Sequence, residues 1–434
     1  AEISRRSFFE WRRIMRNKGQ DYSIKQIDLS KKTCNTDKSL DYLFEYSIVD
    51  EGNGYLGHPD SILLKNGDIL TFFPEGHGRG KVLSKRSVDG GKTYLDGDGV
   101  KNPPENWALS KETPTVYRLT FSERNWDDKL ILICGNPKWW DEKSSVGGFN
   151  CSVSDDEGES FSEFELFFKG EIYPIVAMSS LTRLKKDGRF IDKWMGLFHD
   201  KHFVNYKTFL TFDDNGKMNW TKPVPYFSTY RKIERKSQMC EVECVRSDAG
   251  NGDELMLITR SNSKRVNSLL SFSTDEGETW SEPVFAPSAI NGERHKADYL
   301  PDGRLFITFR SIERDKKKNK MYSEKKFRGW YSEGWIAWVG TYDDLKNGRE
   351  GDYRIKVAHT YLPDQKEPCV TTNADTGYCG NVVLPDGTAV TSSYGIFSTE
   401  EKESGTYSTD KGKLKRKTFI VSKRINTKDV EKLL

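Results

Sequence analysis

The sequence predicts an all-β protein that folds as a six-bladed β-propeller. Two observations support this fold class. A turn motif of eight residues recurs at steps of about 60 residues, and Asn-Gly or Asp-Gly turns between β-rich runs interleave with it. A period of this length is typical of propellers, in which each unit is a four-stranded blade with its loops. Followed to the end of the chain, the repeated units number six.

The octet has Ser at its first position, Asp at its third, Gly at its fifth and an aromatic residue at its eighth. Complete copies occupy residues 87–94, 154–161 and 273–280, and a degenerate copy at 212–220 has Asp214 as its third-position aspartate. Asp in a tight turn accepts hydrogen bonds from nearby backbone amides, and Gly permits a positive φ. We therefore expect each octet to brace a hairpin on the outer rim, far from the central funnel, with its aromatic ring packed between neighbouring blades.

The second periodic signal is a set of hairpin turns that contain Asn-Gly or Asp-Gly. They lie at residues 65–68, 186–188, 301–303 and 385–387. The runs that flank them are rich in β-branched and aromatic residues, which is the composition of strands. Examples are residues 62–64, 69–73, 305–309 and 335–339.

These signals predict one domain that spans residues 1–434. Because an unpaired edge strand would otherwise be exposed, we expect the N-terminal segment 1–50 to help close the ring, with the closing strand in 22–50. No linker-like stretch divides the chain. The six blades are expected near residues 58–100, 110–165, 172–222, 238–285, 293–345 and 370–424.

Composition and charge exclude several classes of partner. The formal net charge of +3 is interspersed along the chain, so we expect no nucleic-acid partner. No apolar stretch reaches the roughly 18–20 residues of a membrane helix, so we expect no membrane partner. The chain has no Cys-x-x-Cys pair, and we expect neither a metal nor a cofactor. The aromatic share of 12% favours sheets and supplies flat surfaces for sugar rings.

Blade 1 and blade 6 each carry a further motif. Gly57-His58-Pro59 precedes the first strand pair of blade 1, and Glu75-Gly76-His77 follows it. In blade 6, Tyr378 precedes a strand that ends in Leu384-Pro385-Asp386-Gly387.

Two other blades place charged residues at corresponding strand ends. Glu241 begins a strand pair whose second strand ends at Arg260, and Arg310 ends a strand of the following blade. Together with the octets, these motifs resemble the sialidase (neuraminidase) superfamily of BNR or Asp-box propellers, and the resemblance covers nearly the whole chain. It implies that Glu241 acts as general base on Tyr378, converting a weak phenol into a nucleophile. It also implies that Arg260 and Arg310 bind a carboxylate.

The chain departs from the family pattern at two places. Gly57-His58 stands where the family has the first arginine of its carboxylate-binding triad, and residues 78–83 hold no counterpart of its acid/base aspartate. Histidine titrates near neutral pH, so His58 is a candidate for the missing proton transfer, with a pH-profile limb near 6–7. The predicted catalytic residues are His58, Glu241 and Tyr378. The predicted substrate contacts are His77, Arg79, Glu112, His199, Arg260, His295 and Arg310.

The resemblance implies an exo-acting glycoside hydrolase that releases a terminal, acidic sugar from a glycan or oligosaccharide. Two alternatives remain open on the same fold. One is a rhamnosidase or uronate lyase that uses histidine, and the other is a glycan-binding propeller without catalytic activity. We expect a secreted or periplasmic location.

Overall fold

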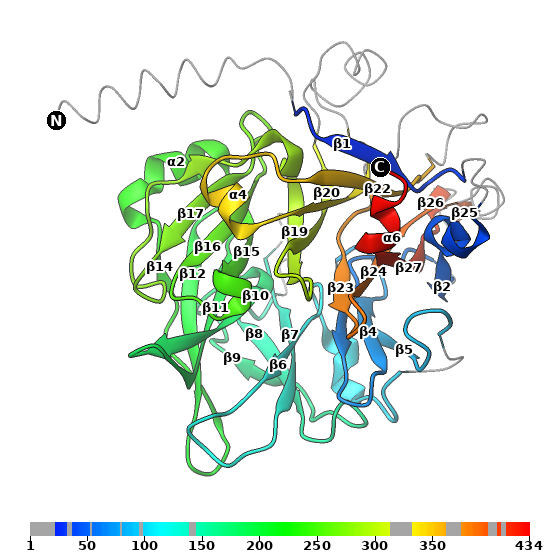
Figure 1. Ribbon diagram of the computed structural model, residues 1–434. Coiled ribbons are helices and arrows are strands. Elements are labelled where there is room, and N and C mark those ends of the chain that lie inside the picture. The colour runs from blue at the N-terminus through cyan, green and yellow to red at the C-terminus, as the bar shows by residue number, and fades with distance from the viewer. Residues whose placement is uncertain are drawn as a thin grey trace, which may run out of the picture.

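The computed structural model describes residues 22–32, 37–52, 54–78, 80–94, 99–138, 145–312, 332–361, 375–397, 406–408 and 414–434 of the 434-residue chain. Six sheets of mainly antiparallel strands follow one another along the chain and are arranged around a common centre (Figure 1). The first strands of neighbouring sheets contact one another, which places them at that centre. The predicted six-bladed β-propeller is therefore confirmed, and the sheets are named blade 1 to blade 6 in chain order.

The strands of the first three blades are as follows. Blade 1 contains β3 (Asp60–Leu63), β4 (Ile69–Pro74) and β5 (Val82–Ser87). Blade 2 contains β6 (Thr115–Leu119), β7 (Lys129–Gly135), β8 (Phe149–Ser154) and β9 (Glu165–Phe167). Blade 3 contains β10 (Ile175–Lys186), β11 (Arg189–His199), β12 (Asn205–Phe212), β13 (Met218–Trp220) and β14 (Val224–Pro225).

The other three blades include the two N-terminal strands. Blade 4 contains β15 (Met239–Arg246), β16 (Leu255–Ser261), β17 (Leu269–Ser273) and β18 (Val284–Phe285). Blade 5 contains β19 (Gly292–Tyr299), β20 (Leu305–Ser311), β21 (Trp335–Gly340), β22 (Tyr353–Ala358) and β1 (Lys25–Asp28). Blade 6 contains β23 (Gly380–Val383), β24 (Thr388–Gly395), β27 (Phe419–Asn426) and β2 (Ser47–Asp50).

Short helices and one small hairpin lie in the connections. The hairpin consists of β25 (Thr406–Ser408) and β26 (Leu414–Arg416). The helices are η1 (Lys38–Phe44), η2 (Glu105–Leu109), η3 (Ser228–Tyr230), α2 (Arg231–Ser237), η4 (Asp248–Gly250), η5 (Ser288–Ile290), α4 (Tyr342–Lys346) and α6 (Thr427–Glu431). None of the helices in the described ranges has the length and apolar character needed to cross a membrane.

The N-terminal segment supplies strands to the outer edges of the last two blades. β2 pairs with β27 at the outer edge of blade 6. β1 also adds to the outer edge of blade 5, parallel to β22, so the segment covers two edges instead of one (Figure 1). The expected end of blade 5 at residue 345 was wrong, because α4 lengthens the connection and β22 follows it. In blade 1, the backbone amides of Gly99 and Val100 donate hydrogen bonds to the carbonyl oxygen and the hydroxyl of Ser84, and no fourth strand pairs with β5 in the described residues.

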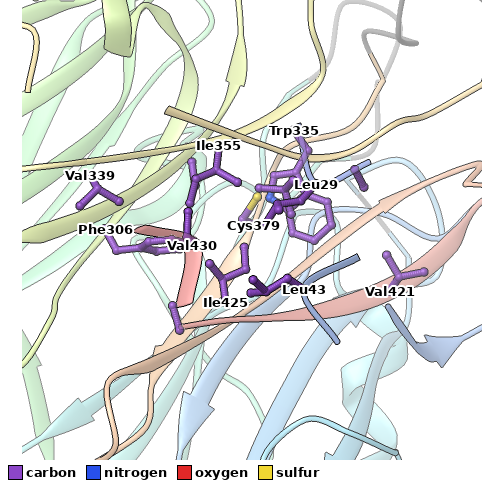
Figure 2. Close-up of a cluster of buried hydrophobic side chains, with 14 of the residues drawn as sticks. Leu29, Leu43, Phe306, Trp335, Val339, Ile355, Cys379, Val421, Ile425 and Val430 are labelled. Atoms are coloured by element: carbon purple, nitrogen blue, oxygen red, sulfur yellow. The ribbon is translucent and has the colours of Figure 1, made fainter. Parts of the chain in front are cut away.

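Apolar side chains fill the layers between neighbouring blades. Figure 2 shows the layer between blades 5 and 6, where Phe306 and Trp335 meet Val421 and Ile425. Leu43 of η1 packs into the same layer, and Leu29 and Val430 place both ends of the described chain there. Alternating strand residues point into such layers, so each blade is buried on both faces and its loops are left at the two ends of the ring.

The three complete octets form the same turn, between the third strand of a blade and the segment that follows. In each, the third-position Asp accepts a hydrogen bond from the seventh-position backbone amide at 2.9 Å, and the first-position Ser hydroxyl accepts one from the Gly amide at 2.9 Å. Phe161 and Trp280 are buried against the preceding blade, as expected. Strand register places these turns at the opposite ends of the strands from His58.

The assignment in the degenerate copy was wrong by one residue. Asp213, not Asp214, accepts the backbone amides of Asn215 and Lys217, both at 2.9 Å. Asp214 is fully exposed. Asp213 accepts the amide of Lys217, four residues later, just as Asp275 accepts the amide of Thr279. The degenerate copy therefore keeps the turn geometry of the octet although it has no Ser at the first position.

Asp275→Ala should destabilise the protein by about 1–2 kcal/mol, because Asp275 accepts hydrogen bonds from the amide and the hydroxyl of Thr279 and from Ser273. Chemical denaturation of the two proteins measures this difference. Asp214→Ala is the control and should change stability little, since that side chain is fully exposed. Equal stability of Asp275→Ala and the parent protein would show that the octet turn is not a brace.

Lys423 of β27 is buried between blades 5 and 6, and no carboxylate in the described part of the chain forms an ion pair with it. Its Nζ donates to the carbonyl oxygens of Leu29 at 3.0 Å and Val357 at 2.9 Å, so it links blade 6 to the N-terminal segment and to β22. A neutral amine has two N–H donors for these two acceptors. Burial lowers the pKa of Lys423 to about 7, and Asp28 opposes this shift.

This lowered pKa predicts a pH dependence of stability. The folded pKa lies below the unfolded value of about 10.4, so above pH 7 the unfolded chain binds more protons and stability rises with pH. Between pH 7 and pH 9 we expect Lys423 to raise the free energy of unfolding by about 2–3 kcal/mol. The Lys423→Met protein should lack this rise. Denaturant unfolding of both proteins across this range measures it. Parallel pH curves for the two proteins would show that Lys423 stays charged when folded.

Candidate active site

The innermost strands of blades 3, 4 and 5 are bulged near their first residues. The pairing register shifts there, and each shift contains a residue with left-handed backbone: Val176 (φ 52°), Glu241 (φ 50°) and Arg294 (φ 50°). His58, two residues before β3, has φ 52°. This conformation costs a non-glycine residue about 1–3 kcal/mol, so its recurrence at corresponding places indicates that the backbone is held there to orient side chains.

Tyr378, Glu241 and Arg260 form the middle of this site. The Tyr378 hydroxyl lies 3.1 and 3.0 Å from the two carboxylate oxygens of Glu241 and donates to them. Arg260 Nη1 donates to Glu241 Oε1 at 2.7 Å and also to the Tyr378 hydroxyl. Because blades 4 and 6 are not neighbours, these contacts span the centre of the ring. Gly377 (φ +80°) allows the segment before Tyr378 to lie close to the backbone of Arg310, since a Cβ at Gly377 would lie 2.8 Å from the Arg310 Cα.

Glu293 of β19 holds the cations around this group together. Its Oε1 lies 3.0 Å from Arg260 Nη2 and 3.2 Å from Lys264 Nζ, and its Oε2 lies 2.9 Å from Arg310 Nε. The Arg310 guanidinium lies 4.4 Å from the centre of the Tyr378 ring. Both predicted arginines therefore flank the phenol, and Glu293 is a residue that sequence reasoning missed.

The charges of Glu241 and Tyr378 follow from their surroundings. Burial favours a neutral Glu241, but Arg260 outweighs it and lowers the pKa of Glu241 to about 2. Burial raises the pKa of Tyr378, and the Glu241 carboxylate adds to this effect while Arg260 opposes it. At neutral pH the site thus holds a carboxylate beside a neutral phenol, an arrangement in which the phenol can lose its proton to Glu241 as it attacks an electrophile.

His58 and His77 lie on the other side of Tyr378. The His58 ring is 4.8 Å from the Tyr378 ring and 4.9 Å from the His77 ring. His58 is 6% exposed, whereas His77 is exposed to solvent. Burial and then the proximity of His77 lower the pKa of His58 well below its usual range. A pH limb from His58 would consequently lie below the predicted 6–7.

The two histidines are connected by a chain of hydrogen bonds that we name the histidine–tyrosine chain: His77, Tyr55, Asp375, Tyr394 and His58. His77 Nδ1 lies 2.7 Å from the Tyr55 hydroxyl, which donates to Asp375 at 3.1 and 3.2 Å. The Tyr394 hydroxyl donates to Asp375 Oδ1 at 3.2 Å and lies 3.3 Å from His58 Nε2. Sequence reasoning missed the three middle residues, although a carboxylate three positions before Tyr378 was a signal for one of them.

Glu112 and His199 approach the centre from blades 2 and 3. Glu112 accepts the backbone amides of Thr113 at 3.0 Å and Val176 at 3.1 Å. Burial raises the pKa of Glu112 to about 8, and the nearby Glu241 adds to it. Burial lowers the pKa of His199 to about 4, although Glu241 opposes this shift. Both side chains therefore lie within electrostatic reach of Glu241, and both are almost fully buried.

One predicted contact, His295, is not brought into this group. His295 is completely buried, its Nε2 lies 2.8 Å from the carbonyl oxygen of Ile290, and its ring packs on Phe309. The bulge at Arg294 changes the alternation of β19, which explains why His295 faces the core. Arg79 lies outside the described residues.

A second charged layer lies two residues further along the inner strands. Lys296 Nζ of blade 5 lies 3.0 Å from Asp60 Oδ1 of blade 1, and these blades are not neighbours. Glu243 of blade 4 accepts the backbone amide of Ala297 at 3.2 Å. Burial raises the pKa of Glu243 to about 7, and Lys296 opposes this shift. These side chains form a polar floor beneath Tyr378 and Glu241.

The group contains the elements of nucleophilic catalysis. A phenol is hydrogen-bonded to a carboxylate, two guanidinium groups flank it, and the His58 imidazole lies beside it with a second imidazole, that of His77, behind His58. Within the described ranges, no three His, Cys, Asp or Glu side chains are arranged to hold a metal ion.

Comparisons with known proteins agree with the fold. The profile of a family described as a BNR repeat-like domain matches residues 115–333. A protein of unknown function from Dyadobacter fermentans has a similar structure, with 15% identity, a TM-score of 0.55, and coverage of 87% of this chain and 98% of its own. No curated protein matches the chain in sequence.

Two solved enzymes share the fold. The intramolecular trans-sialidase from Ruminococcus gnavus has 13% identity and a TM-score of 0.51, with coverage of 88% of this chain and 96% of its own. The GH93 α-L-arabinofuranosidase of Fusarium graminearum has 11% identity and a TM-score of 0.53, with coverage of 89% and 98%. The family profile spans half of the chain, and the octets and six blades agree with it. The chain therefore belongs to the BNR repeat-like family.

Proposed function

We propose that the protein is an exo-acting glycoside hydrolase that releases a terminal, acidic sugar, with Tyr378 as its nucleophile. One observation carries this proposal: the Tyr378 hydroxyl is hydrogen-bonded to both carboxylate oxygens of Glu241 and to Arg260. A tyrosine that is merely packed in a core does not need a carboxylate and a guanidinium on its hydroxyl.

The reaction has two displacements. The Tyr378 oxygen attacks the anomeric carbon and gives its proton to Glu241, while the bond to the leaving oxygen breaks and that oxygen takes a proton from an acid. Water then attacks the anomeric carbon of the glycosyl–tyrosine intermediate, loses a proton to the same acid in its basic form, and displaces the phenolate, which recovers its proton from Glu241. The sugar is released with retention of configuration.

The charges beside the phenol support an acidic sugar. Arg260 and Arg310 flank Tyr378 and offer planar donors that suit a carboxylate. A neutral nucleophile is also compatible with a sugar carboxylate at the anomeric carbon, which would repel a carboxylate nucleophile. Gly57-His58 stands where the family has the first arginine of its carboxylate-binding triad, so we expect the sugar carboxylate to bind two guanidinium groups instead of three.

The paired imidazoles favour a second candidate, a histidine-dependent rhamnosidase or uronate lyase. The His58 and His77 rings are 4.9 Å apart, and the exposed one could protonate a leaving group or remove a proton beside a uronate carboxylate. In this candidate Tyr378 would contact the substrate without forming a bond to it. For either reaction we propose a glycan or oligosaccharide as the partner and a secreted or periplasmic location, where such polymers are met.

A panel of substrates tests the proposal. The purified protein is incubated with methylumbelliferyl glycosides of sialic acid, glucuronic acid, rhamnose and arabinofuranose, and with uronate oligosaccharides monitored for unsaturated products. Release of an acidic sugar with retained configuration, and its loss in Tyr378→Phe, supports the proposal. An unsaturated uronate product supports the lyase. Binding of a glycan without turnover of any substrate supports a propeller that only binds.

A further inference from the structure

The histidine–tyrosine chain attaches two imidazoles to a single carboxylate. Asp375 accepts the hydroxyl protons of Tyr55 and Tyr394, and each tyrosine oxygen faces a histidine nitrogen, His77 Nδ1 at 2.7 Å and His58 Nε2 at 3.3 Å. Because each hydroxyl proton is directed to Asp375, the facing ring nitrogens are left as the donors to the tyrosine oxygens.

The two ends of the chain differ in their access to solvent. His77 is exposed, whereas His58 is buried and its Nδ1 has no hydrogen-bond partner within the described part of the chain. With Nε2 as its donor, His58 keeps an unprotonated Nδ1, the neutral form that burial favours. The two rings would repel each other if both were protonated, because their centres are only 4.9 Å apart. When only one of the two histidines carries an additional proton, that proton is therefore more stable on the exposed ring of His77.

We propose that His77 is the acid and base of the glycosidase reaction and that Tyr55 and Asp375 position it. The inference rests on the proposed function of Tyr378, and it fills the place of the acid/base aspartate that the family has and this chain lacks in residues 78–83.

His77 gives up one proton in the first step and recovers one in the second. His77 Nδ1 donates to Tyr55 in both protonation states, so the ring nitrogen away from Tyr55 gains and loses the proton. That nitrogen gives its proton to the leaving oxygen as the bond to the anomeric carbon breaks. The neutral ring then takes one proton from the water that attacks the glycosyl–tyrosine intermediate and returns to its starting state. The Asp375 carboxylate stabilises the cationic ring through Tyr55, as an orienting carboxylate does for histidine in other catalytic groups.

His58 has a different role in this arrangement. Its neutral ring contacts the Tyr378 ring and leaves the phenol next to Arg260 and Arg310 without a third positive charge. Thus His58 is a positioning residue, and His77 carries out the proton transfer that the sequence predicts for His58. The titratable and charged groups around the histidine pair are Tyr55, Tyr378, Tyr394, Asp375, Arg294 and Arg310.

Nuclear magnetic resonance titration of the histidine rings in the full chain tests the arrangement without any substrate. His77 should titrate at higher pH than His58, and Tyr55→Phe should lower its midpoint by about one pH unit, because the link to Asp375 is lost. Asp375→Asn should shift it in the same direction. Tyr342→Phe is the control, since that hydroxyl binds Glu254, which precedes β16 at the opposite end of the strand from Arg260, and its loss should leave the His77 midpoint unchanged. A His77 midpoint that neither substitution moves would overturn the positioning role.

Leaving-group dependence tests the catalytic role. For one sugar, His77→Gln should lower kcat about 10²–10⁴-fold with an alkyl or sugar leaving group and only slightly with an activated aryl group, which departs without a proton. Equal losses with both would overturn the assignment to His77. Tyr378→Phe should lose turnover of the substrates with either leaving group. The two substitutions therefore distinguish loss of the nucleophile from loss of the acid. If no glycoside is turned over, the catalytic assignment falls with the proposed function, and the titration still decides the positioning role.

Discussion

Tyr378→Phe is expected to lower kcat by about a thousandfold or more, equivalent to about 4 kcal/mol of transition-state stabilisation. The substitution removes one oxygen atom, the one that Glu241 and Arg260 both bind. The ring stays in place against Arg310 and His58, so substrate affinity should change little. Steady-state kinetics on the substrate found in the panel measure kcat, and calorimetry on the same sugar measures affinity.

Tyr42→Phe is the matched control for this substitution. The Tyr42 hydroxyl binds Asp429 of α6 at 2.6 Å, at the outer edge of blade 6, and its loss should leave kcat unchanged. A Tyr378→Phe protein that keeps a tenth or more of the parent kcat would exclude Tyr378 as the nucleophile.

Glu293→Ala is expected to destabilise the fold by about 3–5 kcal/mol, because it leaves three partly buried cations without the buried carboxylate that they share. Glu293 is 2% exposed and lies within 3.2 Å of Arg260, Lys264 and Arg310. Burial acts to raise the pKa of Glu293, but these cations outweigh it and lower the pKa below its usual value. The stabilisation is therefore present at neutral pH and is lost as the pH falls below about 4.

Urea unfolding at pH 7 and at acid pH measures this effect. Glu278→Ala, in which an exposed carboxylate beside Lys207 is removed, should cost less than about 1 kcal/mol and serves as the control. A Glu293→Ala protein as stable as the parent at pH 7 would show that Glu241, which pairs with Arg260, and Asp375, whose Oδ1 lies 3.9 Å from Arg310 Nη1, suffice to balance the cations.

The sequence predicted the features that depend on local signals. Octets and Asp-Gly turns are set by a few neighbouring residues, so their repetition gave the number of blades and the end of each blade at which charged residues gather. The contact of Tyr378 with Glu241 was predicted from the same repeats, because equivalent strand ends meet at the centre of a propeller.

Other features depend on contacts that carry no periodic signal. Tyr55 and Asp375 lie in irregular segments, and only the closed ring brings blade 1 and blade 6 together there. Bulges also break the two-residue alternation of the inner strands, so Arg294 and His295 could not be assigned to the centre or the core from their spacing. The predicted boundary of blade 5 ended too early, at residue 345, because α4 interrupts the strand pattern before β22.

The central claim is that Tyr378 forms a covalent bond to the sugar. It is tested most directly by incubating the protein with a fluorinated analogue of the released sugar that carries a fluoride leaving group, followed by peptide mass spectrometry. A mass increase equal to one glycosyl group on the peptide that contains Tyr378, absent from Tyr378→Phe, is the predicted result. A glycosyl group on another residue, or turnover of the natural sugar with inverted configuration and no labelled peptide, would contradict it.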